Sequence, residues 1–140
     1  MTSLFVSLIA LFGSFVDPDP SAEKKAIKEV ITSFAQAGDK NDVPALEETL
    51  DDSYRIVMNR LFGSSEVSIM SKETYLEKIE SKEYGGGSRK LTFESIVVNG
   101  TTASAKVKFL DEKMTFVSII VLIKDANDHW KLVSDVPVVG

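Results

Sequence analysis

The sequence predicts an α+β protein in which three N-terminal helices pack against one face of an antiparallel sheet. Two observations carry this prediction. From Leu91 to Val139, runs of alternating apolar and polar residues are separated by turn signals, which is typical of consecutive antiparallel strands. Before Leu91, apolar residues recur mainly at the three- and four-residue spacing of amphipathic helices.

Length and composition exclude several classes of protein. A chain of 140 residues is long enough for one domain with a substantial core. The formal net charge of −5 argues against a general nucleic-acid binder, which needs a basic face. Since there is no cysteine and only His129 as histidine, thiolate chemistry and multi-histidine metal sites are excluded. No calcium, phosphate-loop or dinucleotide motif occurs, so we predict no metal and no cofactor.

Residues Leu4 to Val16 form an uncharged apolar run of 13 residues. This is shorter than the roughly 20 residues that a membrane span needs, so no membrane span is predicted. Two interpretations stay open for the segment 1–20, which precedes the domain 21–140. A signal peptide would make the protein secreted or periplasmic, although no basic residue precedes the run. An apolar first helix, packed on the domain or on a partner, would fit a cytoplasmic protein.

The first helix of the domain is expected from Pro20 to Ala37. Asp19 is a suitable N-cap, Pro20 suits the first helical position, and Gly38 suits the position just after the helix. An apolar stripe follows the helical period and predicts the buried face: Ile27, Val30, Ile31 and Phe34.

Two shorter helices and two strands follow. Asp42 can cap a helix over Val43–Leu50, and Ser71 can cap another over Lys72 to about Lys82. The strands are expected at Tyr54–Asn59 and Glu66–Met70. In the first strand, alternation places Tyr54, Ile56 and Met58 on one face and Arg55, Val57 and Asn59 on the other. The glycine run 85–87 is interpreted as a flexible connector.

Asn99-Gly100 is a strong signal for a two-residue hairpin turn. Such a turn pairs Val98 with Thr101 and brings Glu94 opposite Ala105, on the same side as Ala103 and Val107. The next strand, Thr115–Ile123, is apolar on both faces, so both faces should be covered. Helices can cover one face. The other face suggests a homodimer formed sheet to sheet, through Val117, Ile119, Val121 and Ile123.

The order of these elements resembles the nuclear-transport-factor-2-like superfamily, and within it the branch labelled Putative lumazine-binding. The stretches that carry the resemblance are AIKEVITSFAQAGDKNDVPALEETLDDSYRIV, SKETYLEKIES, VVNGTTASAKVKF and HWKLVSDV, spanning about Ala22 to Val136. The resemblance implies a cone-shaped, curved antiparallel sheet wrapped on the helices, with a pocket at the open end. It also implies frequent homodimers through the outer sheet face and a small-molecule ligand. Relatives include many small bacterial proteins, polyketide-cyclase-like proteins and ketosteroid isomerases.

The isomerase chemistry of that superfamily does not carry over by resemblance. Its base would fall near Val57 and its protonated acid near Ile120 or Val121, where this chain is apolar. Glu94 and Asp135 remain as candidate catalytic carboxylates, because burial at the predicted inner face would raise the pKa of either. Asp135 reaches that face only if the turn Asp125–Asp128 has four residues.

Four residues are candidate ligand contacts. Arg55 and Asn59 could hold an anionic or carbonyl group, and Tyr75 and Phe116 belong to the predicted pocket wall. We therefore expect a homodimeric protein that binds a small apolar ligand or acts as a scaffold, with no assigned reaction. Two alternatives stay open: a small isomerase, dehydratase or cyclase that uses a pocket carboxylate, and a protein-interaction module that uses the outer sheet face.

Overall fold

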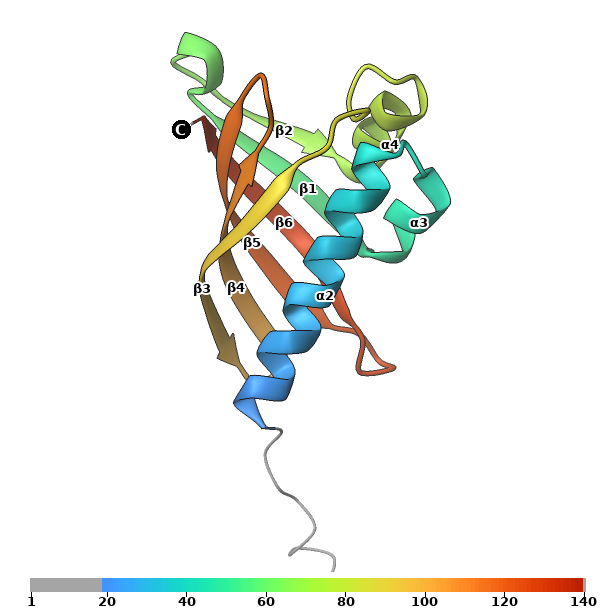
Figure 1. Cartoon of the computed structure of the whole chain (residues 1–140), viewed down its shortest axis with the longest axis vertical. Coiled ribbons are helices and arrows are strands. Elements are labelled where there is room, and N and C mark those ends of the chain that lie inside the picture. The colour runs from blue at the N-terminus through green and yellow to red at the C-terminus, as the bar shows by residue number, and fades with distance from the viewer. Residues whose placement is uncertain (1–18, 140) are drawn as a thin grey trace, which may run out of the picture.

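A computed structural model describes residues 19–139, and Figure 1 shows a long helix lying across a strongly curved sheet. The elements of this region are α2 (Pro20–Asp39), α3 (Val43–Glu48), β1 (Leu50–Asn59), the short 3₁₀ turn η1 (Leu61–Gly63), β2 (Val67–Ser71), α4 (Lys72–Glu80), β3 (Lys90–Asn99), β4 (Thr102–Leu110), β5 (Thr115–Lys124) and β6 (Trp130–Val139). Segment 1–18, which contains the apolar run, lies outside the described residues. No helix between residues 19 and 139 is long and apolar enough to cross a membrane.

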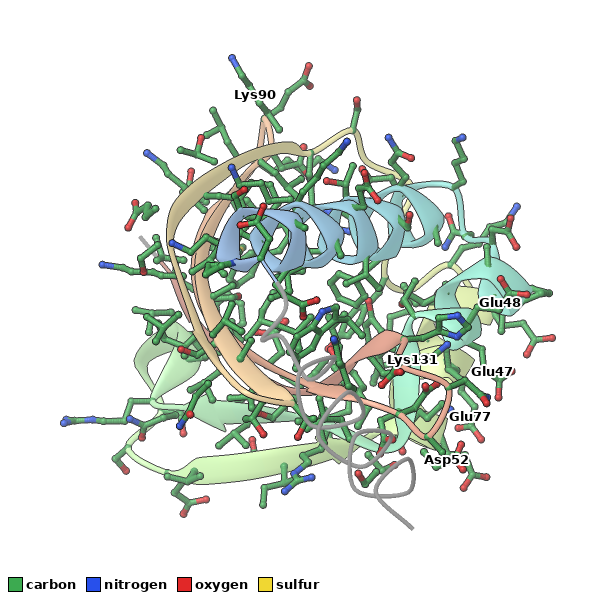
Figure 2. All side chains as sticks on the ribbon, turned by 90° about the horizontal axis from the view of Figure 1, so that it is seen from below. Glu47, Glu48, Asp52, Glu77, Lys90 and Lys131 are labelled. Carbon is green, nitrogen blue, oxygen red and sulfur yellow. The ribbon has the colours of Figure 1, made fainter. Side chains whose placement is uncertain are left out.

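The α+β fold class is confirmed, with one difference in the sheet. The strand order is β2-β1-β6-β5-β4-β3, and all neighbours are antiparallel except β1 and β6, which are parallel. The sheet is therefore mixed. Figure 2 shows it curving around α2, which lies in the concavity. In that view Glu47, Glu48, Asp52, Glu77 and Lys131 lie toward one side of the molecule, away from Lys90.

The parallel pairing explains why β1 begins earlier than predicted. Leu50 pairs with Leu132 of β6, so the chain is already extended at Leu50, and α3 ends at Glu48. Local sequence does not reveal this, because Leu132 is more than 80 residues further along the chain. Two N-caps form as expected: the side chain of Asp42 accepts from the backbone of Ala45, and that of Ser71 accepts from Thr74.

Helix α2 continues through Gly38 to Asp39, where we had expected Gly38 to end it. Gly38 has a packing reason instead. A Cβ atom at this position would lie 3.0 Å from Nη2 of Arg89. The glycine thus lets the Arg89 side chain approach the end of α2.

The β3–β4 hairpin differs from prediction by one residue in its turn. Asn99 pairs with Thr102, so the two turn residues are Gly100 and Thr101, and Gly100 has a positive φ of 62°. Ile96 consequently faces Ala105 rather than Ala103. Because the shift preserves the alternation, the apolar residues of β4 still face inward.

The core fills the space between α2 and the concave face of the sheet. Three helix residues from the predicted stripe are fully buried there: Ile27, Ile31 and Phe34. The sheet contributes a matching set from three strands: Ala103, Ala105, Val107, Phe109, Ile120, Leu122 and Leu132. One end of this concavity is left open, and it holds the cavity described next.

Candidate functional site

A cavity of about 420 Å³ lies at the end of the cone that is marked by η1 and the β4–β5 turn. Its walls come from segments far apart in the sequence: the end of α2, β1, α4, the α4–β3 loop, β5 and β6. Most of the lining is apolar and includes Ile56, Met58, Met70, Phe109, Phe116 and Pro137. A cavity of this size and character suits a small, mainly apolar molecule.

Aromatic rings form one wall of the cavity. The ring centroids of Tyr54 and Tyr75 are 5.8 Å apart, and Phe34 lies 6.3 Å from Tyr54 and 6.4 Å from Tyr75. Tyr84 extends the cluster, at 6.5 Å from Tyr75. These separations are typical of favourable tilted aromatic pairs. The wall therefore offers flat apolar surface with phenol hydroxyls attached.

Asp135 is the buried carboxyl group of the cavity, with 8% of its surface exposed. A bulge in β6 turns it inward: Leu122 pairs with Leu132 but Val121 pairs with Ser134, which leaves Val133 as the extra residue. Burial raises the pKa of Asp135 to about 6, although the Ser118 hydroxyl, through a hydrogen bond, and the Arg89 charge both lower it. Both protonation states are thus accessible near neutral pH.

Two buried polar atoms of the cavity have no hydrogen-bond partner within residues 19–139: the Tyr54 hydroxyl and Oδ1 of Asp135. An unpaired buried polar group costs about 1–3 kcal/mol, so such atoms are rare in folded proteins. Burial and the nearby Asp135 carboxylate raise the pKa of Tyr54, which keeps its phenol protonated and able to donate. Two residues of the cavity lining therefore have a buried donor and a buried acceptor that no described residue uses.

An ion pair borders the same cavity. Nε of Arg89 donates to Oδ1 of Asp39 at 2.7 Å, and Nη2 donates to the carbonyl of Ala35 at 2.9 Å. The guanidinium also lies 5.3 Å from the centre of the Phe109 ring, a favourable cation–π distance. Three separate contacts therefore fix the orientation of Arg89.

The α4–β3 loop is held against the end of α2 by Asn41. Its Nδ2 donates to the carbonyls of Ile79 and Tyr84, both at 2.8 Å. Gly85 has a positive φ of 85°, and a Cβ there would lie 2.3 Å from the Gly38 carbonyl oxygen. The glycine run that we interpreted as a flexible connector is thus a closely packed wall of the cavity.

The structure brings together three of the six residues that the sequence singled out. Asp135, Tyr75 and Phe116 line the cavity. Glu94 does not, because it is itself the extra residue of a bulge between Phe93 and Ser95, and it pairs with Lys106 at 3.2 Å on the outer face. Arg55 and Asn59 are exposed and lie outside the cavity, since the opposite face of β1 points inward.

Sequence reasoning missed Tyr54, Ser118 and Arg89. The alternation of β1 did separate Tyr54 from Arg55, but it could not say which face is buried. Ser118 is the one polar residue in the interior of β5, and that exception was an available signal. Arg89 follows a glycine-rich loop and carries no periodic signal at all. Among residues 19–139, no group of three His, Cys, Asp or Glu side chains is arranged to hold a metal ion.

Solved structures similar to this chain show that it has the nuclear transport factor 2-like fold. One is such a protein of unknown function from Shewanella baltica, with a TM-score of 0.76 at 19% identity, covering 89% of this chain and 98% of that one. A second such protein of unknown function, from Silicibacter pomeroyi, has a TM-score of 0.75 at 19% identity, covering 87% of this chain and 99% of that one. A ketosteroid isomerase-like protein from Erwinia carotovora has a TM-score of 0.63 at 15% identity, covering 82% of this chain and 94% of that one.

The family follows from the sequence itself. The model of the family described as Putative lumazine-binding matches residues 22–136, so the chain belongs to that family. No curated protein matches the sequence. Because the structural neighbours are below 25% identical, they show the fold alone.

Proposed function

We propose that this protein binds a small, flat, mainly apolar molecule in the cavity, with a polar edge of that molecule against Tyr54 and Asp135. The observation that carries the proposal is the pair of buried polar atoms without partners, a phenol donor and a carboxyl acceptor, inside an aromatic-walled cavity. A ligand edge with one acceptor and one donor would satisfy both atoms and remove their desolvation cost.

The family description supplies a first probe, lumazine, which is a flat heterocycle with carbonyl and N–H groups. Isothermal titration calorimetry with the wild type should detect binding. Tyr54→Phe keeps the ring and removes only the hydroxyl, so we expect roughly a tenfold loss of affinity, equivalent to about 1.4 kcal/mol. Asp135→Leu, which removes both carboxyl oxygens at similar size, tests the acceptor in the same way.

Arg55→Gln is the matched control, since Arg55 lies on the opposite face of the same strand as Tyr54. It should bind as the wild type does. Native mass spectrometry of protein purified without added ligand then covers other ligand chemistries, because a co-purified molecule appears as added mass. The proposal would be contradicted if neither lumazine nor the fluorescent aromatic probes bind and no co-purified molecule is found.

A second candidate function is acid–base catalysis on the bound molecule, and the pKa of Asp135 favours it. A carboxyl group that titrates at about 6 can accept a proton at neutral pH and return it. In the reaction that fits this geometry, Asp135 removes a proton from the carbon next to a carbonyl while Tyr54 donates a hydrogen bond to the enolate oxygen.

Deuterium exchange into 2-cyclohexenone, followed by NMR in heavy water, tests this second candidate. The wild type should accelerate exchange and Asp135→Asn should not. If lumazine or another molecule binds but the two proteins give equal exchange rates, the protein is a binder without this activity.

For the partner, we propose a homodimer formed through the outer face of the sheet. Apolar pairs cross that face: Val57 with Ile69, Ile119 with Val136, and Val117 with Val138. Ile119 is 43% exposed and Val138 is 58% exposed. Exposure of such neighbouring apolar side chains to water is unfavourable, and a partner subunit would remove it. Lysines of the next strand, Lys106 and Lys108, border the apolar rows.

Light scattering coupled to size-exclusion chromatography tests the dimer. The wild type should elute with twice the mass of one chain, and Ile119→Lys should elute as a monomer. Val97→Lys, on β3 beyond the lysine row, should stay dimeric. A wild-type monomer would instead favour a face that recruits a different protein.

A further inference from the structure

Arg89 is the charged group of the cavity whose bonding capacity is not used up. Nε and Nη2 donate to Asp39 and Ala35, but Nη1 has no hydrogen-bond partner among residues 19–139. Nη1 is also absent from the buried polar atoms that lack a partner, so it is open to solvent. The guanidinium is therefore held rigidly while one of its nitrogens stays free to donate.

The carboxylate beside Arg89 is fully engaged. Oδ1 of Asp39 accepts from Nε of Arg89, and Oδ2 accepts from the Arg89 backbone N–H at 3.1 Å. Asp39 therefore holds Arg89 in place and has no remaining oxygen that faces a ligand unpaired. A fixed, partly buried guanidinium binds oxyanions well because its geometry does not have to be ordered on binding.

The other charges of the cavity wall belong to the β4–β5 turn. Asp111 and Lys113 both line the cavity, and their formal charges are opposite. One oxygen of Asp111 accepts from the backbone of Glu112, and the other would lie 3.0 Å from a Cβ at Gly87. The carboxyl of Asp135 carries the buried acceptor described above. Arg89 is thus the cation positioned to hold an anionic group.

We propose that Arg89 selects ligands that carry an anionic group, so the cavity takes small amphipathic anions: an apolar ring body against Phe34, Tyr54 and Tyr75, and a carboxylate or sulfonate on Nη1. This inference rests on the proposed small-molecule function and specifies its ligand class. Arg89 acts here as a specificity-determining residue, since it contacts the ligand without taking part in any reaction.

Two fluorescent probes with the same ring system test the inference. 8-Anilinonaphthalene-1-sulfonate carries a sulfonate, and N-phenyl-1-naphthylamine lacks it. The wild type should bind the sulfonate at least about tenfold more tightly, which is the effect of one good charge-assisted contact. Amide shifts in NMR spectra should place both probes in the cavity, with Ser118 and Arg89 among the perturbed residues.

The variants separate charge from shape. Arg89→Met should remove the preference for the sulfonate and leave the affinity for the neutral probe within about twofold. Arg89→Lys should keep part of the preference. Lys25→Met, at an exposed position of α2 outside the cavity lining, is the control for general surface charge and should change the preference by less than about twofold.

Equal binding of both probes by the wild type, or an unchanged preference in Arg89→Met, would overturn the inference while leaving the cavity a binding site. Binding of neither probe would count against the proposed function as well. If Arg89→Met fails to give a cooperative thermal transition, Arg89→Gln, which is also uncharged, decides, and an unchanged sulfonate preference in that variant would contradict the role of Arg89.

Discussion

Two carboxylates of the sheet, Asp135 on β6 and Glu94 on β3, stand next to β-bulges, and the two bulges act in opposite ways. In β6 the extra residue is Val133, which lies before the carboxylate and reverses the alternation, so that Asp135 faces the cavity. In β3 the extra residue is Glu94 itself, which is turned to the outer face and pairs with Lys106. One bulge therefore creates a buried acid and the other removes one.

The difference teaches why alternation alone cannot assign a cavity residue. The five-residue turn Asp125–His129 would, in a regular ladder, place Asp135 on the outer face, because Lys124 pairs with Trp130. We had required a four-residue turn for Asp135 to face inward. The requirement was wrong, yet Asp135 does face inward, since the bulge at Val133 compensates for the longer turn.

The largest expected effect that separates the two carboxylates is the pH dependence of stability. The folded-state pKa of Asp135 is about 6 and its ordinary value is 3.8, so the folded protein keeps a proton that the unfolded chain releases. The stabilisation that comes from the protonated Asp135 carboxyl is fully present below pH 3.8 and is lost as the pH rises to about 6. At 1.36 kcal/mol per pKa unit this amounts to about 3 kcal/mol.

Urea denaturation of the wild type and of Asp135→Asn at several pH values measures this effect. The difference between their free energies of unfolding should change by about 3 kcal/mol between pH 3.5 and pH 7, with the wild type losing stability relative to the variant. A constant difference across that range would mean that Asp135 is not held away from water.

A middle-sized effect is expected at Ser118, whose hydroxyl lowers the pKa of Asp135 through a hydrogen bond. Ser118→Ala should raise the pKa of Asp135 above about 6, because the ionised carboxylate is then destabilised by about 1 kcal/mol. Carboxyl ¹³C NMR of the variant measures the change. A lower pKa in Ser118→Ala would show that the hydroxyl does not stabilise the carboxylate.

The smallest effect is expected at Glu94. Its ion pair with Lys106 joins two well-exposed side chains, and such pairs contribute about 0.5 kcal/mol or less. Glu94→Gln should therefore change stability by no more than this and leave probe binding as in the wild type. Thermal unfolding and the fluorescence titrations check both statements. A loss of probe binding in Glu94→Gln would mean that Glu94 contributes to the candidate site.

Much of the fold could be predicted from the sequence, because its signals are local. The stripe on α2, the caps at Asp42 and Ser71 and the alternation of β4 each lie within one element. The parallel contact of β1 with β6 could not be predicted in this way, since it joins residues far apart in the chain. Tyr75 and Phe116 were identified as pocket candidates because their elements are regular.

The polar part of the site depended on features without a local signal. Arg89 is positioned by Asp39, 50 residues earlier, and by the absence of a side chain at Gly38. Tyr54 became part of the cavity lining only because β1 packs with that face inward. These placements result from tertiary packing, which overrides what a single segment indicates.

The measurement that tests the account most directly is a carboxyl ¹³C NMR titration of Asp135 in the free wild-type protein. If the carboxyl is buried in the lining of an apolar cavity, its signal should titrate with a midpoint of about 6. A midpoint near or below about 4, the ordinary value for an aspartate in water, would contradict the buried acid and the binding site built on it.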